Sequence, residues 1–433
     1  MILPERSDGG GRKEPVSPFV RNPVPDCRSM DAGEIRNGIA GIERGKRTMA
    51  NLMDYMVWRG DIGFDISPWN DVDALAMANL CYLNFQGIDN DRGWTLAEAK
   101  RLELVRETIV SCFEGRKAQF EAMADTVRFG GIRMHHFITL TDEEQGLQFS
   151  ATCYDMPDGT LCVGFRGTDG TFVGWREDFN MSWQTTVPAQ EAAVFYLERA
   201  AEMDERPIRL VGHSKGGNLA AFAAAGCSPA VQDRLREIYS FDGPGMDREV
   251  FEGEGYQRIV GKIHSFVPQT SIVGMMMEYH RAYTVVKSDA SGISQHDPLT
   301  WQIYGPRFET VEKIDANAET ISDTLHEWLL KTNREERAEM VDTLFSVLEN
   351  TKATTFSEMM GERLRTLTGV ALGTRDLDPE SRKAVTKLVG LFLSLGFGNL
   401  VERYRLRRSE TRTEPGENLS EEDSPESEAG KNS

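Results

Sequence analysis

The chain of 433 residues is long enough to bury a sizeable core and to form one large α/β domain with a helical extension. Its formal net charge is -19, and residues 409–433 carry eight acidic against two basic side chains. Such a surface disfavours nucleic acid as a partner. The six cysteines form no CxxC pair and lack ligand-spaced histidines, so their spacing indicates neither a metal site nor a redox motif.

No targeting segment is apparent along the chain. The first residues, MILPERSDGGGRKEP, lack the apolar stretch of a secretory signal. The longest apolar run, residues 388–401, falls short of the roughly 20 residues that a membrane-spanning helix needs. We therefore expect a cytoplasmic protein. The arginines after this run form either the solvated end of a core helix or a weak contact with an anionic membrane surface: Arg403, Arg405, Arg407 and Arg408.

The N-terminal part of the chain changes character twice. Residues 1–48 are rich in Gly, Pro, Arg and Asp without apolar periodicity, which predicts a disordered arm. An alternative is that Met49 is the true start of the protein. Residues 69–117 follow a helical pattern with a broad apolar face, so we expect helices that serve packing rather than chemistry.

Strand-like and helix-like segments alternate in the middle of the chain. Residues 147–154 and 161–165 form a predicted hairpin, and a two-residue Asp158-Gly159 turn would place Cys153 away from Cys162, so no disulfide is expected there. Later segments alternate between helix and strand: residues 189–203, 208–212, the helix after Ser214, 237–241 and 262–267. Such alternation predicts an α/β fold with a mostly parallel sheet and helices on both faces.

Composition sets the predicted domain boundaries. The α/β domain occupies residues 49–308. The chain then becomes purely helical in pattern, and Asp378-Pro379-Glu380 supplies the N-cap, first-turn proline and acid that are typical of a helix start. We therefore predict a helical extension over residues 309–408 and a disordered acidic tail over residues 409–433.

The sequence GHSKG places Ser214 between two glycines at a predicted strand-to-helix junction. Gly-x-Ser-x-Gly in this context is typical of a nucleophile elbow, because the glycines permit the sharp turn that exposes the serine hydroxyl. The N-terminus of the following helix also favours the anions that form during acyl transfer. The alternative is a serine tolerated because a tight corner needs a small residue.

A serine nucleophile of this kind needs a histidine base on a later loop. His213 lies inside the GHSKG sequence and points elsewhere, while His135 and His136 precede the nucleophile in the wrong order. Four histidines follow it: His264, His280, His296 and His326. Of these, His296 lies in a polar loop after the last strand-like segment, where an exposed imidazole is needed, and we favour it over His280.

Four segments together resemble a known family: FRGTDGTFVGWREDF, GHSKGGNLA, SFDGPG and QHDPLTWQ. They are similar to the bacterial Mbeg-like group of α/β-hydrolase proteins and, more distantly, to class 3 lipases. The resemblance implies an α/β-hydrolase fold over about residues 49–305. It also implies an oxyanion hole made by the backbone N–H groups of Thr168 and Lys215. Trp175 and Asp178 match a lipase W-x-x-D pattern, which we interpret as structural support.

The acid is where this sequence departs from the lipases. Their acid lies in an Asp-x-Val-Pro segment, and this chain has Ser265 at the corresponding place. A serine cannot supply the charge that stabilises an imidazolium. Asp242, at the end of the preceding strand, can replace it, because a neighbouring strand end also reaches the histidine loop. Asp297 is the alternative acid, and a turn-capping role is the alternative for Asp242.

Together these residues predict a serine hydrolase of the acyl-ester type: Ser214 attacks, His296 moves the proton and Asp242 holds the imidazole. No cofactor is implied. The substrate is a small-molecule or lipid ester, and the resemblance favours lipids. Residues 272–277 include three methionines that line either an acyl pocket or the core. The alternative function is a binding protein that keeps the hydrolase fold without turnover.

Overall fold

The computed structural model describes residues 50–349, except for residues 86, 88, 108–114, 170 and 278–281. The chain divides into two units, Met1–Thr48 and Met49–Ser433, and the described residues belong to the second. Several predictions therefore lie outside the described residues: the arm at 1–48, His280, the helix start at Asp378, the arginines from Arg403 to Arg408 and the tail at 409–433.

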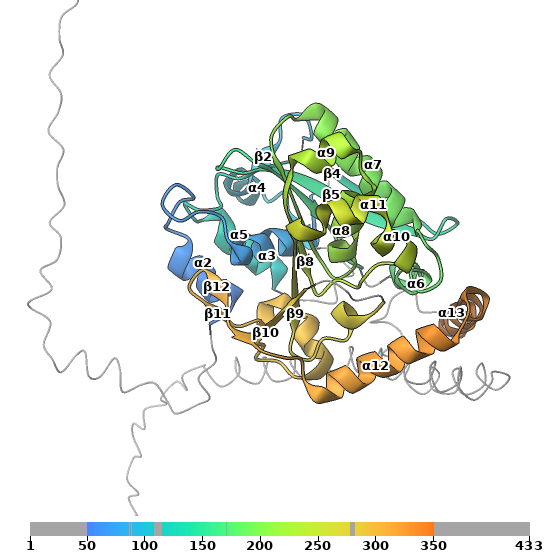
Figure 1. Ribbon diagram of the computed structural model, residues 1–433. Helices are drawn as coiled ribbons and strands as arrows, with labels where there is room; N and C mark the ends of the chain where they lie inside the picture. Colours follow the sequence, from blue (N-terminus) through green and yellow to red (C-terminus); the bar gives the residue numbers. More distant parts are fainter. Residues whose placement is uncertain are drawn as a thin grey trace, which may run out of the picture. The chain divides into compact units, whose positions relative to one another are not determined.

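A nine-stranded mixed sheet has the order β13-β10-β9-β8-β7-β6-β5-β4-β2 (Figure 1). Its strands are β2 (Trp94–Thr95), β4 (Arg133–Asp142), β5 (Leu147–Asp155), β6 (Leu161–Phe165), β7 (Ile208–His213), β8 (Leu235–Phe241), β9 (Ile263–Pro268), β10 (Thr284–Val286) and β13 (Thr310–Val311). From β6 to β10 neighbouring strands pair in parallel, whereas the pairings on either side are antiparallel. The predicted α/β fold is confirmed, with the parallel part in the middle of the sheet.

Helices pack on both faces of this sheet. The described α-helices are α2 (Leu52–Arg59), α3 (Asp71–Leu80), α4 (Leu96–Arg101), α5 (Arg116–Ala124), α6 (Phe172–Asn180), α7 (Pro188–Met203), α8 (Lys215–Gly226), α9 (Pro229–Arg234), α10 (Arg248–Glu252), α11 (Glu254–Ile259), α12 (Ala316–Lys331) and α13 (Arg334–Glu349). Short 3-10 turns are η1 (Val260–Lys262), η2 (Val273–Met275), η3 (Gly292–His296) and η4 (Pro298–Thr300). Two small ribbons pair β1 (Leu83–Asn84) with β3 (Arg106–Glu107) and β11 (Ile303–Tyr304) with β12 (Arg307–Phe308).

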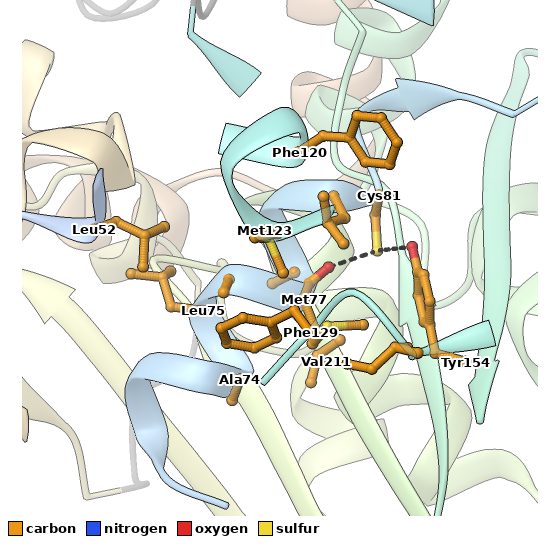
Figure 2. Packing of buried hydrophobic residues seen from close by; sticks show 14 of the residues in the cluster. Leu52, Ala74, Leu75, Met77, Cys81, Phe120, Met123, Phe129, Tyr154 and Val211 are labelled. Atoms are coloured by element: carbon orange, nitrogen blue, oxygen red, sulfur yellow. Dashed lines mark hydrogen bonds between the residues drawn. The ribbon is translucent and has the colours of Figure 1, made fainter. Parts of the chain in front are cut away.

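Two clusters of buried apolar residues hold these layers together. On β7, Leu210 belongs to one cluster and Val211 to the other, because successive side chains of a strand point to opposite faces. Figure 2 shows the cluster around Val211, where Met77 and Cys81 from the α3 region pack near Tyr154 of β5. The other cluster contains the alanine-rich helix α8, whose small side chains allow close packing on the strands.

The prediction of helical structure throughout residues 69–117 is wrong in its second half. Helix α3 ends at Leu80, and the short strands β1, β2 and β3 follow with only α4 between them. Gly87 has φ 95° and Gly93 has φ 67°, and this left-handed backbone interrupts a right-handed helix.

The β5–β6 hairpin is formed, but its register differs by one residue from the one that a two-residue Asp158-Gly159 turn predicts, in which Cys153 lies opposite Gly164. Cys153 lies opposite Val163 and Cys162 lies opposite Tyr154. The turn is longer than two residues, since the Met156 N–H donates to the Thr160 carbonyl at 3.0 Å. The cysteines within the described residues are free, so the expected lack of a disulfide between Cys153 and Cys162 is confirmed.

After strand β13 the described chain is helical. Helix α13 packs on α6, where the rings of Phe345 and Phe179 lie 5.9 Å apart. An exposed ion pair, Arg176 to Asp342 at 2.6 Å, joins the same two helices. Across the described ranges, each helix is too short or too polar to cross a membrane.

Candidate active site

Ser214 lies at the turn between β7 and α8, at the carboxyl end of the parallel strands. Its backbone has φ 58° and ψ -133°, a strained conformation for a residue with a side chain. The turn is tight on both sides: a Cβ on Gly212 would lie 2.0 Å from the Gly216 carbonyl oxygen, and a Cβ on Gly216 would lie 2.2 Å from the Phe165 carbonyl oxygen. Both glycines of GHSKG are therefore required by close backbone contacts.

Three side chains from separate elements meet beside this turn. Ser214 Oγ lies 3.0 Å from His296 Nε2, and His296 Nδ1 lies 2.5 Å from Asp242 Oδ2. The relative exposures of Ser214, His296 and Asp242 are 9%, 6% and 1%, so the hydrogen bonds are largely screened from water. The structure thus brings together the serine, histidine and first-choice acid that the sequence analysis selected.

Asp242 is held in place from three directions. Its backbone follows β8 in a left-handed conformation with φ 48°. While Oδ2 faces the imidazole, Oδ1 accepts hydrogen bonds from Ser271 Oγ at 2.5 Å and from the Gly274 N–H at 3.0 Å. A Cβ on Gly274 would lie 2.3 Å from Asp242 Oδ1, which explains a glycine at that position.

The alternative acid has a different place in the structure. Asp297 precedes the η4 turn, and its carboxylate accepts from the Leu299 N–H at 3.2 Å. The turn-capping role weighed for Asp242 therefore falls to Asp297. The other described candidates for the base lie elsewhere: His264 stacks on Tyr239 in the sheet, and His326 lies in α12.

His213 forms a hydrogen bond to the backbone of the loop that carries His296. Its Nε2–H donates to the His296 carbonyl at 2.8 Å, and the Tyr82 hydroxyl lies 2.8 Å from its Nδ1. Burial holds the pKa of His213 well below its usual value, so the ring is neutral and its Nδ1 accepts from the tyrosine. His213 does point away from the serine hydroxyl as expected, but its link to Tyr82 could not be predicted from the local sequence.

The segment after β6 borders the turn. Gly212 pairs with Phe165 in the sheet, and Gly216 packs directly on the backbone of residues 165–167. Thr168 follows this segment, and its hydroxyl donates to the Asp178 carboxylate. Lys215 begins α8, so its N–H belongs to the first turn of that helix. The two residues predicted for the oxyanion hole thus come from the two segments that meet at Ser214.

A family model described as Mbeg1-like matches residues 123–346. The chain belongs to the Mbeg1-like family. The matched region contains the serine, histidine and acid described above together with both oxyanion candidates, so the resemblance inferred from the motifs is confirmed.

Solved lipase structures are similar to this Mbeg1-like chain only distantly. One is the crystal structure of M37 lipase, with 13% identity, 47% of this chain and 69% of that chain covered, and a TM-score of 0.31. Another is the native propeptide complex of the lipase from Rhizomucor miehei, with 13% identity, 58% and 76% covered, and a TM-score of 0.32. No curated protein matches the chain in sequence.

The Lys215 side chain is a structural element that the motifs did not predict. The side chain is 1% exposed, and its ammonium group donates to Glu177 at 2.9 Å and to both oxygens of Gln148. Glu177 in turn accepts from the Ala189 N–H at 2.8 Å. In this Mbeg1-like protein the buried ion pair therefore ties the start of α8 to α6 and β5. The sequence alone does not indicate that this lysine is buried, because its partners are distant along the chain.

Asp178 and Trp175, expected as structural supports, both lie on α6. Desolvation raises the pKa of Asp178 to about 7, although the Lys215 ammonium 3.9 Å away opposes the shift. The Asp178 carboxyl receives the Thr168 hydroxyl, so it orients a residue next to the turn. The methionines at 275–277 are half-buried beside Gly274 and hence beside the Asp242 loop.

Proposed function

We propose that this Mbeg1-like protein is a serine hydrolase that cleaves carboxylic esters through an acyl-enzyme. The observation that carries the proposal is the continuous hydrogen-bonded series from Ser214 Oγ through His296 to Asp242, placed at a strained strand-to-helix turn. Serine, imidazole and carboxylate in this order are the groups that generate an alkoxide-like nucleophile at neutral pH. The chain order of Ser, Asp and His is also that of α/β-hydrolases.

In the acylation step Ser214 Oγ forms a bond to the ester carbonyl carbon, and His296 Nε2 takes the hydroxyl proton. His296 then gives that proton to the leaving alkoxide as the ester C–O bond breaks. The Asp242 carboxylate accepts the Nδ1–H throughout, which fixes the tautomer and stabilises the imidazolium. Water reverses the sequence in the second step, releasing the acid and restoring Ser214. These steps require no cofactor.

The developing negative charge on the carbonyl oxygen needs fixed hydrogen-bond donors. The N–H groups of Lys215 and Thr168 supply them in this proposal. Lys215 lies at the start of α8, where unpaired N–H groups and the helix dipole favour an anion. Close packing of Gly216 on residues 165–167 supports the approach of Thr168 to the same place.

For the substrate we propose an ester with an apolar acyl chain. The half-buried methionines at 275–277 adjoin the acid loop, and flexible thioether side chains adapt to acyl chains of different shape. The competing function is a hydrolase-fold binding protein without turnover. Such a protein would have the same fold but would not hydrolyse esters.

The deciding experiment is labelling of the full-length protein with a fluorophosphonate probe, together with hydrolysis of a chromogenic acyl ester. We expect wild type to label, Ser214→Ala to lose labelling completely, and ester turnover of that variant to fall by about 1,000-fold or more. His296→Ala labels far more slowly, because the hydroxyl keeps its proton.

Ser265→Ala is the matched control, since Ser265 is a buried serine on β9, a strand of the same sheet that β8 separates from β7. It retains labelling and turnover. A wild-type protein that is folded by circular dichroism but neither labels nor hydrolyses any acyl ester overturns the proposal in favour of the binding protein.

A further inference from the structure

A second cluster of reactive side chains lies in the antiparallel half of the sheet, away from Ser214. His135 of β4 and Cys153 of β5 are directly paired residues, so their side chains project from the same face of the sheet. That face is the one covered by α7, because Cys153 belongs to the buried cluster that includes Leu197. Register alone therefore places an imidazole beside a thiol.

A β-bulge adds a second imidazole to the same face. The pairing of β4 with β5 shifts between His135 and Ile138, and His136 has φ 51°. In a regular strand, adjacent residues point to opposite faces, whereas a bulge with a left-handed residue re-aims one of them. As a result the rings of His135 and His136 lie 4.6 Å apart, with their Nδ1 atoms facing each other within hydrogen-bond distance.

We propose that His135, His136 and Cys153 form a zinc site, here called the histidine–cysteine cluster. One ligand atom from each residue lies within 4.8 Å of the others, so small side-chain rotations bring all three around one ion. Zinc prefers imidazole nitrogen at about 2.0 Å and thiolate sulfur at about 2.3 Å, usually in a tetrahedron. Three protein ligands leave the fourth position to water.

The surroundings of the cluster orient its ligands as metal sites require. His135 Nε2–H donates to Asp155 Oδ1 at 3.1 Å, and an ion pair with Arg206 anchors that carboxylate. A carboxylate that receives one ring N–H leaves the other nitrogen with a free lone pair, and here that nitrogen is Nδ1. The ion would replace the proton that His136 Nδ1 donates to His135 Nδ1.

Tyr196 of α7 holds the other two ligands. Its hydroxyl donates to the His136 carbonyl at 2.7 Å, which fixes the bulge, and lies 3.3 Å from Cys153 Sγ. Cys153 is 1% exposed and forms the floor of the cluster, whereas the His135 side chain is 13% exposed and forms part of its rim. An ion would therefore enter past the imidazoles and meet the thiol last.

The proposed ion does not take part in the chemistry of Ser214. Cys153 pairs with Val163, which pairs with Leu210, and Leu210 precedes Ser214 by four residues along β7. The rise along a strand and the spacing between strands then separate Cys153 from Ser214 by roughly 15 Å. The ion would instead join β4 to β5, and its test is independent of hydrolase activity.

The test uses full-length, reduced protein stripped of metal, titrated with zinc chloride against a chromophoric chelator. We expect one zinc per chain. Affinity falls by about 100-fold or more in Cys153→Ser and in His136→Asn, and by about 10-fold in Asp155→Asn, which removes only the orienting carboxylate. Asparagine suits position 136 because it tolerates the left-handed backbone that the bulge needs.

Cys227→Ser and His264→Asn are the controls, because they change a buried thiol directly after α8 and a ring on β9 without touching the cluster. Both should bind zinc as wild type does. Cobalt added to wild type gives a second readout, a thiolate-to-metal charge-transfer band that needs no variant to fold. Failure of wild type to take up one equivalent, lack of the cobalt band, or unchanged affinity in both ligand variants overturns the proposal.

Discussion

Ser214 and His136 are both residues with side chains that adopt left-handed backbone, with φ 58° and 51°. Each conformation turns a reactive side chain away from the direction that a regular element would give it. At Ser214 the strain lifts a hydroxyl to the end of the parallel strands, and at His136 it brings an imidazole beside its neighbour. Strained backbone of this kind persists only where surrounding contacts fix it, and it concentrates at functional sites.

The two positions differ in what fixes them. The turn at Ser214 depends on glycines two residues away on either side, so its requirement is written in the local sequence as GHSKG. The bulge at His136 depends on pairing with β5 and on Tyr196 of α7, which lies 60 residues further along the chain. Local sequence patterns therefore indicate the turn at Ser214 but not the bulge at His136.

Asp242 is a third residue with left-handed backbone, with φ 48°, and its replacement has the largest expected effect on kcat. Asp242→Asn keeps a residue suited to that backbone but removes the charge, so we expect kcat for ester hydrolysis to fall by about 10,000-fold. Asp297→Asn, at the capping position, should change kcat by less than about 2-fold. Steady-state kinetics and the rate of fluorophosphonate labelling measure both.

The opposite ranking of these two variants would show that Asp297 is the working acid. The acid would then lie next to His296 in sequence rather than at the end of a separate strand, so the Ser214 site would depend less on long-range contacts.

Sequence reasoning reached the parts of this molecule that depend on short-range patterns. Strand and helix alternation predicted the α/β fold, chain order and loop context favoured His296, and a place at a neighbouring strand end favoured Asp242. It did not reach β-strand register, because the β5–β6 turn is longer than its Asp-Gly step indicates, and a shift by one residue changes every cross-strand partner. Partners such as Tyr82 and Glu177 could not be predicted either, because only the folded chain brings them near residues 213–215.

Tyr82→Phe tests one such long-range partner and has the next largest expected effect. The Tyr82 hydroxyl fixes His213, and His213 Nε2–H holds the His296 carbonyl, so Tyr82 is a positioning residue. Loss of the hydroxyl should lower kcat by about 10-fold with KM nearly unchanged, because the imidazole is held less precisely and the substrate is not touched.

Tyr154→Phe is the matched control, because Tyr154 is also a buried tyrosine and its hydroxyl faces Cys81 rather than a histidine. It should leave kcat as in wild type while lowering stability by a similar amount. Equal losses of kcat in the two variants would mean that general packing, rather than the link through His213, supports the histidine loop.

The last prediction concerns the pH dependence of stability near Ser214 rather than kcat. Asp178 has a folded pKa of about 7 against 3.8 for the free side chain, so between these values the folded chain holds a proton that the unfolded chain has released. The free energy of unfolding therefore falls as pH rises from about 4 to 7, by at most about 1.4 kcal/mol per pH unit, and is level above that window.

Asp178→Asn removes this slope, so its stability relative to wild type should be greater at pH 8 than at pH 5. Urea unfolding at the two pH values measures the difference, and Asp233→Asn, at an exposed carboxylate, is the control in which it should not change. A slope identical in wild type and Asp178→Asn would mean that water reaches this carboxyl, and that the contacts beneath Thr168 are looser than those that hold His136.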